Sequence, residues 1–113
     1  MASAALARVD KSQVTELKSL PVPPPLVKMT MEAVNTILGE GTDWHVVQKV
    51  LSDPSFLDRL KGVSSDNVST AVLDKLQKCI DNADYTPDNV GRQSKAAKSL
   101  CAWTHAFYNE AKA

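Results

Sequence analysis

The sequence predicts an all-α protein: a single small bundle of five to six helices. Apolar residues recur every three to four positions along most of the chain, the spacing of amphipathic helices. Glycine and proline separate these stretches, and no stretch alternates as a strand would. A length of 113 residues with 43% hydrophobic residues supports one domain with a modest core.

The first two helical stretches are separated by a proline-rich corner. We expect a charged helix from Ala5 to Leu20 and a compact amphipathic helix over Leu26–Leu38 that begins at Pro25 and is closed by Gly39. Between them lie four of the six prolines of the chain, Pro21, Pro23, Pro24 and Pro25. Proline has no backbone N–H and moves the preceding residue toward extended geometry, so no helix passes through this segment. A stiff corner of this kind suggests a globular head mounted on a stalk.

The remaining elements follow from caps and apolar spacing. Thr42 or Asp43 caps a second helix of the head, Asp53-Pro54 opens a third that Gly62 ends, and Ser64 or Ser65 caps a fourth. Thr86 with Pro87 starts another turn of helix, and a last helix follows Gly91. The residues expected inside are Val27, Met31, Val34 and Leu38; Trp44, Val47, Val50 and Leu51; Phe56, Leu57 and Leu60; Val68, Val72, Leu76 and Ile80; and Ala96, Ala97, Leu100, Trp103, Thr104, Phe107 and Ala111.

Composition excludes several classes of function. Thirteen basic residues balance thirteen acidic ones, so net charge favours no polyanionic partner, and no aromatic residue lies among the clustered cations; we expect no nucleic acid. No apolar run approaches the roughly 20 residues of a membrane span, and the start of the chain lacks the pattern of a secretory signal. Cys79 and Cys101 are isolated thiols, which favours a reducing compartment and a cytoplasmic location.

Cations gather at the start of the last helix, where the helix dipole favours anions. Arg92, Lys95 and Lys98 fall in its first two turns, and Lys28 repeats the placement after the prolines. Such local inconsistencies tend to mark functional sites. The alternative is a solvated face, with Asp84 and Asp88 as partners.

The sequence offers no catalytic or metal-binding constellation. It contains no glycine-rich phosphate loop, nucleophile elbow or carboxylate dyad. Cys101 and His105 stand four apart on one helix, but no second pair with ligand spacing accompanies them. We therefore expect no enzyme activity, no metal and no cofactor in this chain.

In order and spacing, the segments resemble the microtubule-binding domain at the tip of the dynein heavy-chain stalk. The resemblance runs from about Val14 to the end of the chain, and its Ser94–Trp103 stretch is closer to axonemal than to cytoplasmic heavy chains. It rests on Glu16-Leu-Lys-Ser-Leu, Pro23-Pro24, Val27-Lys28, Glu32-Ala-Val, Leu38-Gly39, Asp43-Trp44, Phe56-Leu57, the helix from Asp66, and Gly91-Arg92-Gln-Ser94-Lys-Ala-Ala97 with Leu100 and Trp103.

The resemblance implies a division of the chain and a set of roles. Residues 1–20 would be the distal end of the first coiled-coil strand, residues 21–100 the helical head, and residues 101–113 the start of the returning strand. The first and last helices would form the base of an antiparallel coiled coil, and the prolines the junction of coil and head. Coil register would set affinity for α/β-tubulin in microtubules, coupled to a distant ATPase ring of the parent motor, in the cytoskeleton of a cilium or flagellum. Tubulin would contact Lys28, Glu32, Lys49, Arg92, Lys95 and Lys98.

The chain departs from the family pattern at two points. Where relatives carry basic residues in the second helix and just after it, this chain has Gln48 and Asp53, with Lys49 displaced by one position. In the first helix, Val9 and Val14 cannot both join Leu6, Leu17 and Leu20 in one seam. A different class of function also fits the sequence: a helical adaptor that docks a partner helix in an apolar groove. Co-sedimentation with microtubules separates the two.

Overall fold

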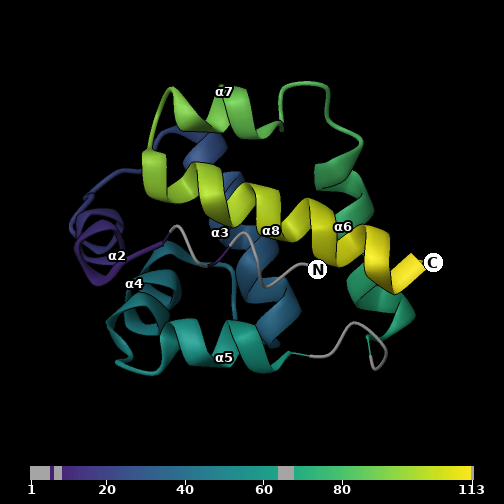
Figure 1. The fold of residues 1–113 in the computed structure, drawn as a ribbon, viewed down its shortest axis with the longest axis horizontal. Coiled ribbons are helices and arrows are strands. Elements are labelled where there is room, and N and C mark those ends of the chain that lie inside the picture. Colours follow the sequence, from purple (N-terminus) through teal and green to yellow (C-terminus); the bar gives the residue numbers. More distant parts are fainter. Residues whose placement is uncertain (1–5, 7–8, 64–67, 113) are drawn as a thin grey trace.

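A computed structural model gives the fold over residues 6, 9–63 and 68–112, and this described part is all-α, as predicted. The described residues form seven helices and no strand, arranged as in Figure 1. The number exceeds five to six because the turn of helix at Pro87 stands apart from the last helix. The elements are α2 (Lys11–Lys18), α3 (Pro25–Leu38), α4 (Trp44–Ser52), α5 (Phe56–Gly62), α6 (Thr70–Ile80), α7 (Pro87–Gly91) and α8 (Lys95–Lys112).

The longest helix, α8, runs across the molecule and packs against α3 in the centre of the bundle (Figure 1). The Trp103 side chain is only 1% exposed, and its ring lies 5.4 Å from that of Phe107. From α3, Val27, Met31 and Val34 are fully buried. Burial of this size drives the folding of a small domain, at roughly 1.5–3 kcal/mol for each large apolar side chain. The α3–α8 pair is therefore the core on which the other helices pack.

The unbroken helix predicted from Ala5 to Leu20 is wrong. Asp10 is extended (φ −117°, ψ 173°), and its carboxylate accepts a hydrogen bond from the Gln13 N–H at 2.8 Å, so α2 begins at Lys11. An extended residue resets the helical register, and this removes the conflict within the first seam: Leu6, Val9, Val14 and Leu17 are all buried. Residues 1–5 and 7–8 of the predicted helix lie outside the described part.

The proline corner is held by α4. Pro24, the N-cap of α3, has φ −58° and ψ 154°, the extended geometry expected before another proline. On the other side, the carbonyl groups at the end of α2 accept hydrogen bonds from α4. The Trp44 Nε1–H donates to the Leu20 oxygen at 2.8 Å, and the Gln48 amide donates to the Lys18 oxygen at 3.1 Å and the Leu20 oxygen at 3.3 Å. The half-buried Trp44 thus packs against the core and also caps the carbonyl end of the α2 segment.

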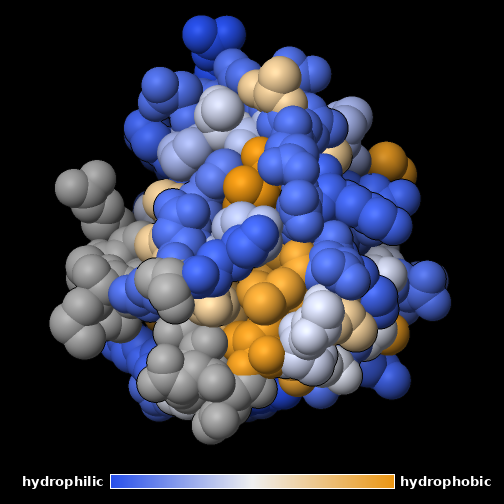
Figure 2. All heavy atoms as spheres, turned by 90° about the vertical axis from the view of Figure 1, so that its right-hand side faces the viewer, coloured by the Kyte–Doolittle hydropathy of each residue, from blue (hydrophilic) through white to orange (hydrophobic). Residues whose placement is uncertain are grey.

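The fourth helix of the head starts later than predicted. The N-cap of α6 is Ser69, whose hydroxyl accepts from the Val72 N–H; the predicted caps Ser64 and Ser65 lie outside the described residues. Of the four residues expected on its inner face, only Leu76 is buried. Figure 2 shows an apolar stripe among hydrophilic side chains on the side of the molecule that carries α6. No helix in the described ranges is both long and apolar enough to cross a membrane.

One glycine is required by backbone geometry. Gly39 ends α3 in the left-handed conformation (φ 76°), and a Cβ there would meet no atom within 4 Å. Replacing Gly39 with Ala should lower the free energy of unfolding by about 1–2 kcal/mol, because a Cβ is strained in this conformation. Gly62 is a matched control, since it also has open space and lacks the positive φ. Urea denaturation should show Gly62→Ala unchanged or more stable by up to about 1 kcal/mol; equal losses in both variants would contradict the assignment.

Candidate functional site

The first part of the candidate site is a hollow beside the proline corner. It has a volume of about 630 Å³ and is lined by Pro21, Val22, Pro23, Pro25, Lys28, Glu32, Thr42, Asp43 and Trp44. Lys28 is exposed in the first turn of α3, and Glu32 follows one turn later, half-buried. The two predicted residues of α3 therefore face the corner together.

A second hollow also borders the start of α3. It measures about 370 Å³ and is lined by Pro25, Leu26, Asp84, Asn89, Arg92 and Gln93. Pro25 borders both hollows, one of which is also lined by Lys28 and the other by Arg92. The fold thus brings the start of α3 beside the turn between α7 and α8, although Lys28 and Arg92 are far apart in the sequence.

Of the three cations expected in the first two turns of the last helix, Arg92 lies before that helix, at the C-cap of α7. Lys95 and Lys98 are exposed in the first turn of α8. A Cβ added to Gly91 would lie 2.7 Å from the Cδ of Lys98, so a glycine lets the lysine stem pack across the end of α7. Lys49 is exposed on α4, and like Lys95 and Lys98 it lines neither hollow. We call Lys28, Glu32, Arg92, Lys95 and Lys98 the corner surface, because they lie on α3, on α8 and in the turn before α8; Lys49 lies on a different helix, α4.

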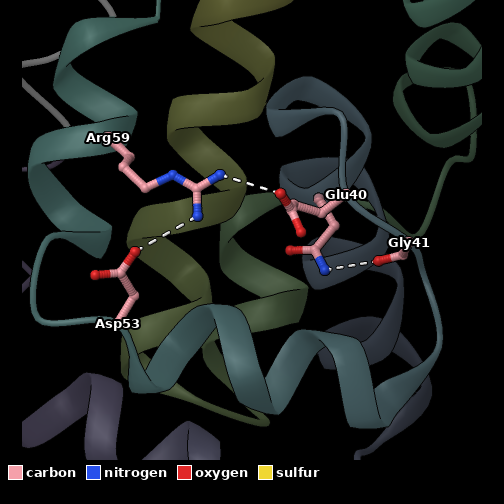
Figure 3. Close-up of polar contacts among 5 residues, drawn as sticks. Glu40, Gly41, Asp53 and Arg59 are labelled. Atoms are coloured by element: carbon pink, nitrogen blue, oxygen red, sulfur yellow. Dashed lines mark hydrogen bonds and ion pairs between the residues drawn. The ribbon is translucent and has the colours of Figure 1, made fainter.

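The cations of the corner surface form no ion pair with any described residue, and neither does Lys49. Asp84 and Asp88, the partners expected for a merely solvated face, do not pair with them. The described ion pairs belong to Arg59, which reaches Glu40 at 3.3 Å and Asp53 at 3.6 Å (Figure 3). That arginine ties α5 to the loops on either side of α4, whereas the cations of the corner surface are left free for a partner.

Gln48 and Asp53, the two departures from the family pattern, are used inside the fold. The Gln48 amide caps the end of α2. The Asp53 carboxylate faces Arg59 and accepts a hydrogen bond from the Ser55 N–H at 2.8 Å. These side chains stabilise the junctions of α4 with its neighbours. The two positions at which relatives carry basic residues therefore serve internal contacts in this chain.

Cys101 and His105 take part in a buried polar cluster with Tyr85. The Tyr85 hydroxyl shares a hydrogen bond of 2.7 Å with the Thr104 hydroxyl. The His105 ring stacks on Tyr85 at 5.2 Å, and its Nε2 lies 2.8 Å from the Tyr85 carbonyl oxygen, which can only accept, so Nε2 carries the proton. Cys101 is fully buried, and burial raises the pKa of its thiol to about 12. The same cause raises the pKa of Tyr85 above its ordinary value.

Two residues that matter here have no signal in the apolar spacing. Tyr85 lies between α6 and α7, outside both helices, yet it is fully buried and fastens this loop to α8. Gln93 lines the second hollow beside Arg92. Their contacts join segments distant in the chain, so periodicity does not report them. The sequence did contain one hint for Gln93: the prolines before α3 offer no polar side chain as an N-cap, so a cap had to come from elsewhere in the chain.

Comparison with known proteins shows the family of the chain and agrees with its fold. The family described as "MT: Microtubule-binding stalk of dynein motor" matches residues 1–109. The chain is 39% identical to human dynein axonemal heavy chain 6 over 86% of its length, and 35% identical to the cytoplasmic dynein heavy chain of Caenorhabditis elegans over 93%. It spans about 2% of the length of each. The solved structure "Microtubule Binding Domain of DYNEIN-C" is similar with a TM-score of 0.84 at 26% identity, over 98% of this chain and 81% of that one.

The buried thiol makes a prediction for alkaline pH. The folded-state pKa of Cys101 lies above its ordinary value of 9.0, so folding keeps the thiol neutral while the unfolded chain ionises. Its contribution to stability is full below about pH 9 and is lost as pH rises toward 12. Cys101→Ala should therefore destabilise the chain less at pH 10.5 than at pH 7.5, measured by urea denaturation. The same loss at both pH values would show that the thiol is not kept neutral by burial.

Proposed function

The chain belongs to the family of microtubule-binding stalk domains of dynein motors, and from this we propose that its corner surface binds the tubulin dimer. A stalk domain is a non-catalytic part of the dynein heavy chain. The proposal concerns which residues make the contact: Lys28, Glu32, Arg92, Lys95 and Lys98, with Lys49 at the edge.

The observation that supports it is the set of exposed cations near the start of α3 and the start of α8, which form no ion pair with any described residue. Such lysine and arginine side chains can meet the acidic surface of tubulin without first breaking an ion pair to a described carboxylate. Lys28 and Lys95 also lie in the first turns of their helices, where the helix dipole disfavours positive charge by about 0.3–1 kcal/mol. A placement that opposes local stability is expected where a partner supplies the compensation.

We also propose that residues 1–20 and 101–113 continue into the two strands of a stalk coiled coil, whose register sets the affinity of the head. The contacts of α2 support this. Because Trp44 and Gln48 bind the carbonyl groups at its end, a shift of α2 would move α4 and the proline corner with it. Sliding by half a heptad is about 5 Å at 1.5 Å per residue, enough to move Lys28 into or out of contact.

The parent motor is proposed to be an axonemal heavy chain of a cilium or flagellum, with the ATPase ring outside this chain. The resemblance of the Ser94–Trp103 stretch supports this assignment. The 37% identity to the flagellar dynein-1-beta heavy chain of Chlamydomonas reinhardtii points the same way, although the cytoplasmic relative is nearly as similar.

Charge reversal tests the corner surface. Arg92→Glu or Lys95→Glu should weaken microtubule co-sedimentation about tenfold or more, equivalent to about 1.4 kcal/mol. Melting should be nearly unchanged, since exposed substitutions alter stability by about 0.5 kcal/mol or less, and an acid at position 95 suits the helix dipole.

Lys75→Glu is the matched control, because this lysine is exposed on α6, outside both hollows, and the change of charge is identical. It should bind as the unchanged chain does. If Arg92→Glu and Lys95→Glu bind equally well, the corner surface is not the microtubule site.

The register hypothesis has its own experiment. The two ends of the chain are fused to a rigid antiparallel coiled coil in two registers, because α2, with 8 residues, is too short to set a register alone. Two different microtubule affinities are expected. Equal affinities in all registers, with circular dichroism showing an intact fold, would leave microtubule binding in place and remove the coupling.

A further inference from the structure

The first turn of α3 lacks a cap of its own. The N-cap residue is Pro24, which carries no side-chain acceptor, and Pro25 at the first helical position has no N–H. Helices usually satisfy their first N–H groups with a nearby Ser, Thr, Asp or Asn side chain. Here the first available donor, the Leu26 N–H, donates to the Oε1 of Gln93 at 3.1 Å. The cap of α3 comes from 67 positions away in the chain.

Gln93 lies in a turn that is closed on itself. Its own N–H and that of Ser94 both donate to the Val90 oxygen, at 2.9 and 3.0 Å. Ser94 in turn starts α8: its hydroxyl accepts from the Ala97 N–H at 3.3 Å, and its carbonyl oxygen accepts from the Lys98 N–H at 3.0 Å. A residue in such a turn cannot move without moving its neighbours.

We propose that Gln93 is a positioning residue, which holds the turn carrying Arg92 and Lys95 against the start of the helix carrying Lys28. This inference rests on the proposed microtubule-binding function of the corner surface. By accepting the Leu26 N–H, the Gln93 amide holds the cations of the two segments in one surface. Through the same hydrogen bond, a movement of the proline corner would be transmitted to the start of α8.

Two substitutions of similar length separate this role from others. Gln93→Met removes the oxygen acceptor and leaves the side chain neutral. Gln93→Glu keeps an oxygen that the Leu26 N–H can reach, and a carboxylate suits a helix N-terminus. It also adds a negative charge, which by itself would weaken binding to an acidic partner. We call the hydrogen bond between the Leu26 N–H and the Gln93 side chain the latch. If the latch positions the cations, the Gln93→Glu variant should bind microtubules more tightly than the Gln93→Met variant. If charge alone matters, the Gln93→Met variant should bind more tightly.

The test measures microtubule co-sedimentation of the 113-residue chain and amide hydrogen exchange at Leu26. Gln93→Met should weaken binding about fivefold, the loss of one ordinary hydrogen bond, and expose the Leu26 amide to exchange. Gln93→Glu should bind within about twofold of the unchanged chain and keep that amide protected. In a background of Arg92→Ala with Lys95→Ala, Gln93→Met should cause little further loss, because Gln93 acts through those cations.

Several results would overturn the proposal: Gln93→Glu binding more weakly than Gln93→Met, an undiminished fivefold loss in the double-alanine background, or no change in exchange at Leu26. If the unchanged chain fails to bind microtubules, the proposed function fails instead. The latch is then judged by the amide chemical shifts of Arg92 and Lys95. They should move in Gln93→Met and return in Gln93→Glu; shifts unchanged by Gln93→Met would overturn it.

Discussion

The constraint on which this structure depends is that a run of prolines cannot complete its own hydrogen bonds. Proline supplies a carbonyl oxygen but no N–H, so both helices that meet at residues 21–25 end with unsatisfied backbone groups. The free oxygen of Leu20 is taken by Trp44, and the free N–H of Leu26 by Gln93. The corner is consequently fastened to α4 on one side and to the α7–α8 turn on the other. Three elements distant in sequence are joined because one short segment needs partners.

The core beneath the corner combines apolar packing with a few buried polar pairs. The hydroxyls of Tyr85 and Thr104 share a hydrogen bond. The Asn35 side-chain N–H donates to the Gly41 carbonyl at 2.8 Å (Figure 3), bracing the loop after α3, whereas the buried Asn35 Oδ1 has no hydrogen-bond partner among the described residues. Buried polar groups are tolerated when they are paired, and they then favour one arrangement over others. These pairs hold the loops that flank α3 and α8, so the two helices that carry the corner surface have a fixed relation to each other.

Charge in this chain acts through placement rather than amount. The net charge is zero, yet the pairing of Arg59 with Glu40 and Asp53 occupies acids away from the corner. The cations of the corner surface keep none of the described carboxylates as ion-pair partners. In the proposed interface, exposed ion pairs with a partner would be weak individually and sensitive to small displacements, which suits repeated binding and release.

The sequence by itself determined the helical class, the corner, the core residues of α3 and α8 and the cations near it, because apolar period, proline and charge are local properties. The comparisons then placed the chain in its family. The start of α2 at Lys11 is also local, because Asp10 caps it through the Gln13 N–H, although apolar spacing did not report it. Tertiary structure alone decided that the start of α3 lies beside the turn that carries Arg92. It also decided the roles of Tyr85 and Gln93. Contacts such as those of Gln93 and Tyr85 are made by whichever side chain the folded chain brings within about 3 Å of an unsatisfied group. That proximity is set by the packing of the whole bundle, and local apolar spacing does not record it.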